Sequence, residues 1–591
     1  MEQGNKEQLI YNIISLSELM LTTGIQFLDA YRKKSEEGNI HFNDLLAGLK
    51  VLNEIYPQIE GKLNHAYYMP MLTNIDDTLL RVEEAVNSGG EERALSLIEY
   101  QLIPILQEFK EEVTFWGTIY PDKAKMALYY QNDFVPQHAN SYIEKENRPY
   151  QVSIFIPVYN KVEYTRQCIE SIYRYTDFDR YKCEFILIND GSTDGTEAYF
   201  ESLNIKKVIN LKENVKASIF TTAFRVCEGE FFLFVNNDTL VTDGWLDNLM
   251  ACIQSDEKII SATPCTPNTS NLQTDLEHLF PQELSELEHF KNTSNPDLWE
   301  ERSRIMPVIA IYRAKLLNEI GFADRLFYTL EYWDDDFSLR ARRAGYRQML
   351  CRDTYCYHFG SVTGKKDIEE NNTIQHGNKL FYFKNGVSAW SIGFCFDYYL
   401  LEALKIKNEK KSGKIRILGI DCGFGDTLLA IKNYYSKCGN KVIVDSLILD
   451  ERYQEDMAAI SDNCILAQNI EKGLAGFQKN SYDLIYFSKR IENCDAVFSS
   501  LQTIYSLLRT GGVFAFSINN IFYAPNLSVC MSGKFPWESN FISFVNPFVM
   551  EQELKQVFFH QLCIPIWDTE NTDSSENQIS MAEKFVFYCE K

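Results

Sequence analysis

The stretch from Phe231 to Asp238, FFLFVNND, ends in two amides and a carboxylate after five apolar, strand-forming residues. This pattern indicates a buried strand that delivers polar groups to its carboxyl end, the edge where ligands bind in an open α/β sheet. A carboxylate such as Asp238 is a ligand for a hard cation, and a cation with few protein ligands usually takes the others from substrate phosphates. The structural alternative is a plain Asn/Asp turn after a strand.

Two similar segments precede this one in the chain. VSIFIPVYN (152–160) predicts a buried strand that ends at Pro157, and EFILINDGSTDGT (184–196) predicts a second strand that ends in carboxylate, glycine and hydroxyl residues. LKENVKASIFTTAFRVCEG (211–229) supplies a helix before the strand at Phe231. Strand, helix and strand in succession predict a parallel sheet with right-handed crossovers.

These segments together resemble the nucleotide-sugar half of a family 2 glycosyltransferase of the GT-A fold. The resemblance covers roughly residues 150–393 and rests on five motifs in order: IPVYN, INDGSTDGT, VNNDT followed by GWL, LEYWDDDFSLRARRAGY and CYHFGSVTG. One such motif alone would be weak evidence, whereas five in the right order are specific. The resemblance implies an α/β domain that binds a nucleoside-diphosphate sugar.

The resemblance also implies residue roles at the donor site. Asp190 corresponds to the aspartate that accepts from the pyrimidine base, with an Asx turn as its structural alternative. Asp238 matches the last carboxylate of the metal-binding D-x-D motif, with Asn236 in place of the first, and His358 resembles the histidine that completes the metal site. Mn²⁺ or Mg²⁺ is the expected cofactor, acting as a Lewis acid on the departing diphosphate. The residues expected at the nucleotide sugar are Pro157, Tyr159, Asn160, Asp190 and Asn237.

The general base is expected in the run of three aspartates at 334–336. Aligned on the Leu-Arg pair that follows, the proton-accepting position falls on Asp334, with Trp333 where the family often has an acid. That departure keeps Asp335 as the alternate base, and capping of a helix is the structural alternative for one of the three. One base and a single displacement predict inversion at the anomeric carbon.

A second departure from the family pattern lies in the segment 214–229. Val215, Lys216 and Thr221 occupy positions where the family usually has small residues or glycine. The donor pocket is therefore expected to differ from that of typical members.

From Lys414 the sequence IRILGIDCGFGDTLLAIKNYY predicts a strand, a glycine-bearing turn and a helix. The segment to Asn520 resembles a class I S-adenosylmethionine-dependent methyltransferase, and the resemblance puts a cofactor site at Gly419, Asp421, Gly423 and Gly425. The ribose acid would be Asp445 or Asp450, neither in register, and Asn469 stands at the acidic position near the adenine. Cofactor binding therefore stays open, and the preferred interpretation is a cofactor-free module that binds a partner or stabilises a dimer.

The composition of the chain limits the cellular compartment and the binding partners that can be expected. The 591 residues carry a formal net charge of −24, which argues against general binding to nucleic acids or anionic membranes. The 15 cysteines include no C-x-x-C pair, which favours a reduced, cytoplasmic protein. We see no secretory signal and no apolar stretch that could span a membrane; Val387 to Leu404 carries Asp397 and Glu402 and predicts a buried helix.

Three domains are predicted: a helical domain at 1–140, the GT-A domain at 150–395 and the methyltransferase-like Rossmann domain at 413–591. The helical region is expected either to dock a partner or to have a structural role, which includes formation of a homodimer. The leading hypothesis is a metal-dependent inverting transferase that moves a hexose or N-acetylhexosamine to a hydroxyl of a glycan or protein, flagellin Ser/Thr included. The alternatives are a glycan methyltransferase, alone or in a bifunctional enzyme, and a non-enzymatic scaffold.

Overall fold

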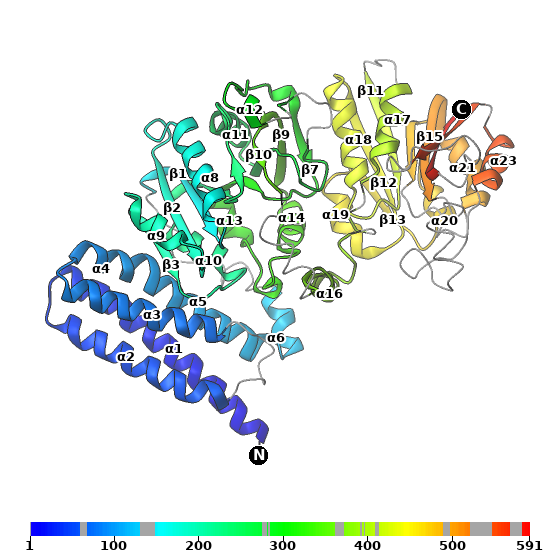
Figure 1. The fold of residues 1–591 in the computed structure, drawn as a ribbon. Helices are drawn as coiled ribbons and strands as arrows, with labels where there is room; N and C mark the ends of the chain where they lie inside the picture. The colour runs from blue at the N-terminus through cyan, green and yellow to red at the C-terminus, as the bar shows by residue number, and fades with distance from the viewer. Residues whose placement is uncertain are drawn as a thin grey trace. The chain divides into compact units, whose positions relative to one another are not determined.

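The computed structural model describes residues 2–58, 68–130, 148–274, 280–281, 284–360, 372–390, 393–394, 396–407, 413–487, 497–519, 547–558, 560–567 and 582–591. The chain divides into two compact units, and each is described by itself. The first comprises residues 1–299 and 305–380, and the second comprises residues 300–304 and 381–591. Figure 1 colours the chain from the blue helical bundle of the first unit to the yellow-to-red second unit.

The first unit begins with a bundle of amphipathic helices. On its second helix Leu45, Leu49 and Leu52 are buried at three- and four-residue spacing, which is the pattern of a helix with one apolar face. Gly89 has a φ of +75° and lies in the turn that follows the third helix. The helices are α1 (Glu2–Arg32), α2 (Glu37–Ile55), α3 (Tyr68–Asn87), α4 (Glu91–Leu97), η2 (Ile98–Leu102), α5 (Ile103–Thr114), η3 (Phe115–Ile119) and α6 (Lys123–Leu128).

A mixed β-sheet follows the bundle. Its strands include β1 (Tyr150–Val158), β2 (Cys183–Asp190), β3 (Lys207–Leu211), β4 (Gly229–Val235), β6 (Ile259–Cys265), β8 (Ile309–Arg313) and β9 (Arg347–Tyr355). Within the first unit they lie in the order β3-β2-β1-β4-β8-β6-β9. β1 pairs in parallel with both β2 and β4, so the strand order reverses beside β1. Such a reversal opens a crevice at the carboxyl ends of the strands, and ligands bind there.

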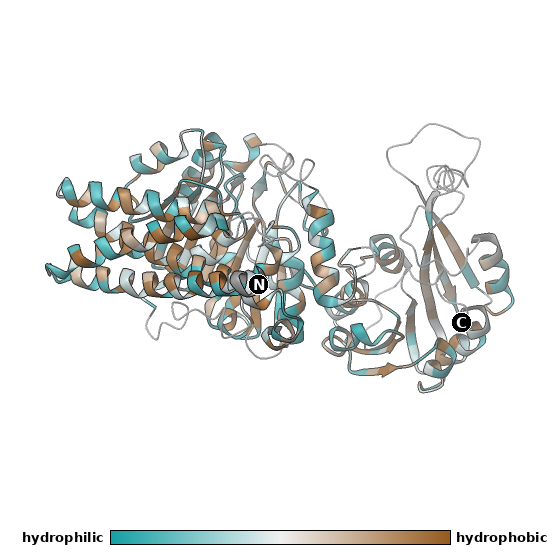
Figure 2. Ribbon diagram, turned by 90° about the horizontal axis from the view of Figure 1, so that it is seen from below, coloured by the Kyte–Doolittle hydropathy of each residue, from teal (hydrophilic) through white to brown (hydrophobic). Residues whose placement is uncertain are grey.

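Helices cover this sheet and bury its apolar side chains. They are α8 (Val162–Tyr175), α9 (Thr196–Ser202), α10 (Ser218–Val226), α11 (Trp245–Gln254), α12 (Leu284–Leu287), α13 (Ala314–Ile320), η6 (Arg325–Phe327) and α14 (Trp333–Arg343). Ile154, Leu187 and Leu233 on three adjacent strands are fully buried in one core. Figure 2 shows the strands as mostly apolar, whereas the bundle helices alternate polar and apolar residues.

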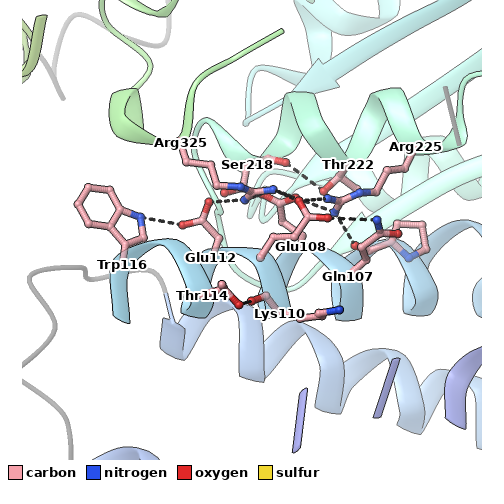
Figure 3. A network of polar contacts seen from close by, with 12 residues as sticks. Gln107, Glu108, Lys110, Glu112, Thr114, Trp116, Ser218, Thr222, Arg225 and Arg325 are labelled. Carbon is pink, nitrogen blue, oxygen red and sulfur yellow. Dashed lines mark hydrogen bonds and ion pairs between the residues drawn. The ribbon is translucent and has the colours of Figure 1, made fainter. Parts of the chain in front are cut away.

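The bundle is joined to the sheet domain by buried ion pairs. Arg325 of η6 pairs with Glu108 at 2.5 Å and with Glu112 at 2.6 Å, and Arg225 of α10 pairs with Glu108 at 2.6 Å (Figure 3). Glu111 also pairs with both arginines. Buried charges are tolerated only when they are paired, so these contacts fix α5 of the bundle against two elements of the sheet domain.

The second unit contains a doubly wound sheet in the order β13-β12-β11-β14-β15-β17-β16. The strands β11 to β15 are parallel, and β17 is antiparallel to both of its neighbours. The strands are β11 (Lys414–Ile420), β12 (Lys441–Ile448), β13 (Asn463–Leu466), β14 (Tyr482–Phe487), β15 (Leu508–Asn519), β16 (His560–Trp567) and β17 (Ala582–Glu590). The helices are α17 (Tyr398–Lys407), α18 (Asp426–Lys437), η7 (Glu451–Tyr453), α19 (Gln454–Ala458), α20 (Ile470–Leu474), α21 (Val497–Leu507) and α23 (Pro547–Lys555).

The fold class predicted from the sequence is confirmed: helices, then a GT-A-like α/β domain, then a Rossmann-like domain. Two local predictions are wrong. β1 continues past Pro157 to Val158, because a proline costs only one donor and Pro157 still pairs with Ile188. The helix expected over 387–404 begins only at Tyr398, where Asp397 Oδ1 accepts from the Leu400 amide at 3.1 Å.

Three further points concern the predicted domain boundaries, the last family motif and membrane-spanning helices. The predicted domain ends at 140 and 395 lie outside the described residues, so the three-domain division stays a prediction. Residues 361–364 of the last family motif also lie outside them. No helix in the described ranges combines the length and the apolar character that crossing a membrane requires.

Candidate active site

The strand register brings three predicted site segments to one edge of the sheet. Val158 pairs with Asn189, and Phe155 pairs with Phe234. Continued to the strand ends, this register places the end of β1 between Asp190 on one side and Asn237 on the other. The sequence-predicted donor residues on these segments therefore meet at the carboxyl edge of the sheet beside β1.

Asp190, at the end of β2, is 5% exposed, and its Oδ1 accepts from the Val215 amide at 2.8 Å. Burial raises the pKa of Asp190 to about 7, although the Val215 amide and the Lys216 ammonium both act to lower it. Tyr159 is 43% exposed, and Lys216 Nζ lies 5.9 Å from the centre of its ring. A buried acceptor beside an exposed aromatic ring suits a planar base that carries an N–H group.

Asn160 joins the end of β1 to the loop after β2. Its amide donates to Ser192 Oγ at 2.8 Å, and its Oδ1 accepts from the Thr193 amide at 2.8 Å. Its φ is +60°, a conformation that asparagine tolerates better than most residues. Asn160 thus keeps the ends of β1 and β2 in register.

Asn237 supports the same strand end from behind. It is 6% exposed, and its Nδ2 donates to Thr165 Oγ1 at 2.9 Å and to the Asn160 carbonyl at 3.3 Å. The carboxamide nitrogen is therefore occupied by protein groups. The contact of Asn237 with a donor stays a prediction, and the structure gives this residue a role in holding Asn160.

Asp238 and His358 are brought together by a short antiparallel pair. β5 (Thr239–Leu240) pairs with β10 (Tyr357–His358), and the Phe359 amide donates to the Asp238 carbonyl at 3.0 Å. His358 Nε2 lies 3.4 Å from Asp238 Oδ1. His358 is 5% and Asp238 3% exposed, and within the part of the chain that the structure describes neither Asp238 Oδ1 nor His358 Nδ1 has a hydrogen-bond partner.

These two residues fit the first ligands of a divalent cation. A buried carboxylate oxygen without a hydrogen bond is costly, and a cation held between Asp238 Oδ1 and His358 Nε2 would satisfy that oxygen. Among the residues that the structure describes, no group of three or more His, Cys, Asp or Glu side chains could hold a metal ion. Within the described residues, Asp238 and His358 would therefore hold a cation together with ligands from elsewhere, and a diphosphate is one such source.

The three aspartates of α14 have different environments. Asp334 is partly exposed, whereas Asp335 and Asp336 are each 1% exposed. Asp336 Oδ2 accepts from Arg340 Nε at 2.8 Å across one helical turn. Only Asp334 combines a carboxylate with access from solvent, and this favours it over Asp335 as the group that meets an acceptor hydroxyl.

The approach to α14 has an unusual backbone. Leu330 has a φ of +81° and Tyr332 a φ of +69°, a region that large side chains rarely adopt. Glu331 between them accepts from Thr373 Oγ1 at 2.6 Å. The backbone before Asp334 is thus held in a sharp turn, which aims the first turn of α14.

The helical bundle also bonds β3 and the loop that follows it, which the sequence did not predict. Asn74 of α3 bonds the backbone of Lys212 and Glu213, and Gln101 of η2 bonds the backbone of Asn210. An amide inside an amphipathic helical pattern carries no sign of its distant partner. Only its burial, 1% exposure for both residues, marks it as special.

In the second unit the glycine turn between β11 and α18 follows the prediction. Asp421, Gly423 and Gly425 all have positive φ values. Gly419 packs against Leu428, and a Cβ at Gly419 would lie 2.5 Å from the Leu428 side chain. This is the tight strand-to-helix turn of a Rossmann-like fold.

The candidate ribose acids of this unit are engaged elsewhere. Asp445 lies inside β12, where it accepts from Tyr482 Oη at 2.5 Å and pairs with Arg416 at 2.6 Å. Asp450 pairs with Arg452 at 2.5 Å, and Asn469 caps α20 by accepting from the Lys472 amide at 3.0 Å. Each of the two acids therefore already has a basic partner within its own unit.

The sheet of the first unit, with a buried acceptor and a carboxylate–imidazole pair at its carboxyl edge, is that of a GT-A-like α/β domain. Residues 153–321 match the model of the family Glycosyl transferase family 2. Residues 8–112 match a domain of unknown function, DUF8042. The chain thus carries a family 2 glycosyltransferase domain and is a glycosyltransferase.

Relatives agree with this assignment. The chain is similar to the putative glycosyltransferase EpsH of Bacillus subtilis, at 23% identity over 44% of this chain and 72% of that protein. It is also similar to the poly(ribitol-phosphate) beta-N-acetylglucosaminyltransferase TarS of Staphylococcus aureus, at 29% identity over 29% of this chain but only 30% of TarS. Among solved structures, a SAM-dependent methyltransferase of Archaeoglobus fulgidus matches 33% of this chain and all of its own, with 16% identity and a TM-score of 0.25.

Proposed function

We propose that the chain is a metal-dependent, inverting glycosyltransferase that moves a hexose or N-acetylhexosamine from a nucleoside-diphosphate sugar to a hydroxyl group. The observation that carries the proposal is the pair of Asp238 Oδ1 and His358 Nε2, 3.4 Å apart and buried at the donor edge of the sheet. A site with two protein ligands suits a cation that is shared with a diphosphate.

Each part of the donor has a counterpart at this edge. Asp190 accepts from the base, Tyr159 and Pro157 flank it, and Asn160 keeps the two strand ends in place. Asp238 and His358 hold Mn²⁺ or Mg²⁺, which supplies Lewis-acid stabilisation of the leaving diphosphate when bound. Uracil and thymine each carry an N–H group that a carboxylate accepts, and we propose a UDP- or dTDP-sugar as the donor.

Asp334 acts on the acceptor. Its carboxylate takes the proton of the acceptor hydroxyl while the hydroxyl oxygen forms a bond to the anomeric carbon. The bond between that carbon and the diphosphate oxygen breaks on the opposite face, so the configuration inverts. The partial exposure of Asp334 supports this role, because the base must meet a second substrate.

The acceptor is a hydroxyl of a glycan or of a protein, such as flagellin Ser/Thr. The sugar is a hexose or an N-acetylhexosamine; the similar protein TarS is named as an N-acetylglucosaminyltransferase. The Rossmann-like domain is proposed as a cofactor-free module that binds a partner or stabilises a homodimer. The engaged carboxylates of Asp445 and Asp450 support this part of the proposal.

Release of nucleoside diphosphate from a panel of sugar nucleotides, with and without Mn²⁺, tests the function. One donor should be turned over only with metal, and both Asp238→Asn and Asp334→Asn should lose that turnover. Binding of no donor by the wild-type chain would refute the proposal.

A further inference from the structure

Asn74 of the helical bundle forms three hydrogen bonds to the backbone just after β3. Its Oδ1 accepts from the Lys212 amide at 2.7 Å and the Glu213 amide at 2.8 Å, and its Nδ2 donates to the Glu213 carbonyl at 2.9 Å. The residue is 1% exposed. A carboxamide that both accepts from and donates to backbone groups takes the place of a neighbouring strand, and β3 is the edge strand here.

The segment that Asn74 holds is in direct contact with Asp190. Two residues beyond Glu213, the Val215 amide donates to Asp190 Oδ1 at 2.8 Å. A Cβ at Gly191 would lie 2.6 Å from the Asn214 nitrogen and 2.7 Å from the Glu213 carbonyl carbon. The loop 212–215 and the turn after Asp190 therefore pack backbone to backbone, so a shift of one displaces the other.

Gln101 makes a similar contact without this consequence. It accepts from the Asn210 amide at 3.0 Å and donates to the Asn210 carbonyl at 3.0 Å. Asn210 lies inside β3 and is also paired with Asn189 of β2, so the sheet holds it from the other side. β3 ends at Leu211, and the loop 212–215 lies beyond that support.

We infer that Asn74 is a positioning residue of the donor site, which fixes the loop 212–215 against Asp190 and so makes the helical bundle part of nucleotide recognition. The inference rests on the proposed function, in which Asp190 accepts from the base of a UDP- or dTDP-sugar. It gives a role to the region that matches a domain of unknown function. If the loop visits several conformations, the apparent affinity for the nucleotide falls in proportion to the fraction of time that the loop spends in the binding-competent one.

Titration calorimetry of the full chain with UDP and Mn²⁺ tests the inference. Asn74→Ala should bind UDP about tenfold more weakly or worse, and its KM for the donor should rise while kcat changes little. Gln101→Ala is the matched control, because it removes the same kind of buried amide contact from the same face. It should lose thermal stability to a similar extent and bind UDP within about threefold of wild type.

Hydrogen exchange gives a readout that needs no nucleotide. The amides of Lys212, Glu213 and Val215 should exchange faster in Asn74→Ala and remain protected in Gln101→Ala, because an amide that loses its acceptor opens more readily. If Asn74→Ala does not fold, Asn74→Asp serves instead, since it keeps both acceptor contacts but replaces the donation to Glu213 by a carboxylate oxygen that repels that carbonyl.

The outcomes separate the inference from the function on which it rests. Wild-type affinity in Asn74→Ala, or equal weakening in both variants, would overturn the inference and leave the glycosyltransferase assignment intact. Failure of the wild-type chain to bind either UDP or dTDP would overturn the donor assignment itself and the inference with it. Weak binding in Asn74→Ala alone, with faster exchange of the loop, supports the inference.

Discussion

His358 Nε2 lies 3.4 Å from Asp238 Oδ1, although the two residues follow different strands of the domain. The contact exists because β10 pairs with β5, which directly follows Asp238. Both groups are buried, and a buried carboxylate oxygen that has no hydrogen bond within the described residues is unfavourable. This one relationship connects the sheet topology to the metal chemistry proposed for the leaving group.

His358→Ala should raise the Mn²⁺ concentration for half-maximal donor turnover by at least about tenfold, because it removes one of two protein ligands. Metal titrations of activity measure the shift. His289→Ala, which removes an exposed histidine, is the control and should titrate like wild type. Equal metal requirements in all three proteins would exclude His358 as a ligand.

Asp334→Asn should lower kcat by about 10²- to 10⁴-fold with the donor affinity unchanged, since it removes the base but no donor contact. Asp336→Asn should instead lower Tm, because it removes the charge that pairs with Arg340 across one turn of α14. Steady-state kinetics and thermal melts separate the two effects. A larger loss of kcat in Asp335→Asn than in Asp334→Asn would transfer the role of base to Asp335.

Donor binding should release protons near neutral pH through Asp190. Burial raises the pKa of Asp190 to about 7, and an N–H group of the base would favour the ionised form. Binding should therefore release part of a proton at about pH 6.5 and weaken as the pH falls further, with little release at pH 8.5. Calorimetry in buffers of different ionisation enthalpy measures this release, using a UDP-sugar whose diphosphate does not titrate in this range.

Asp190→Asn provides the contrast for this measurement. The variant carries no titratable group at this position, so its binding should release no proton at any of these pH values. Proton release that persists in the variant would assign the titration to another group.

Glu112 should make the stability of the first unit pH-dependent. Burial raises the pKa of Glu112 from 4.5 to about 7, even though its pair with Arg325 acts to lower it. The folded protein thus binds the proton more tightly than the unfolded chain, so this contribution to stability is full below about pH 4.5 and is lost as the pH rises to about 7. Glu112→Gln, which mimics the protonated form, should gain Tm relative to wild type between pH 5 and pH 8.

Thermal melts across this pH range measure the difference. Arg325→Gln is the companion variant, because it leaves the carboxylates of α5 facing one another without that guanidinium, and it should lower Tm most at high pH. A difference between Glu112→Gln and wild type that does not vary with pH would show that Glu112 does not titrate in this window.

S-adenosylmethionine should neither raise Tm nor give binding heat with the full chain, since Asp445 and Asp450 are paired with Arg416 and Arg452. Asp445→Asn should lower Tm, because it breaks the contacts with Arg416 and Tyr482 inside the sheet. Saturable binding of the cofactor would restore methyl transfer as an activity to be tested.

Local pattern was enough to predict much of this architecture. The apolar runs that end at Asp190 and Asp238 predict strands, and the structure has β2 and β4 there. Strand periodicity and the residues of a strand end lie within a few positions of one another, so the sequence alone determines them. The same holds for the amphipathic helices of the bundle and for the glycine turn at Gly423.

The order of the sheet and the contents of the site were decided by the tertiary structure. β3 escaped prediction because KVINL is short and polar at its start, and only pairing with β2 makes it a strand. Asp334 is distinguished from Asp335 by exposure, which depends on what packs against α14. Asn74 of α3 bonds the loop 212–215 just beyond the edge strand β3; such contacts join residues far apart in the chain, and local sequence carries no record of them.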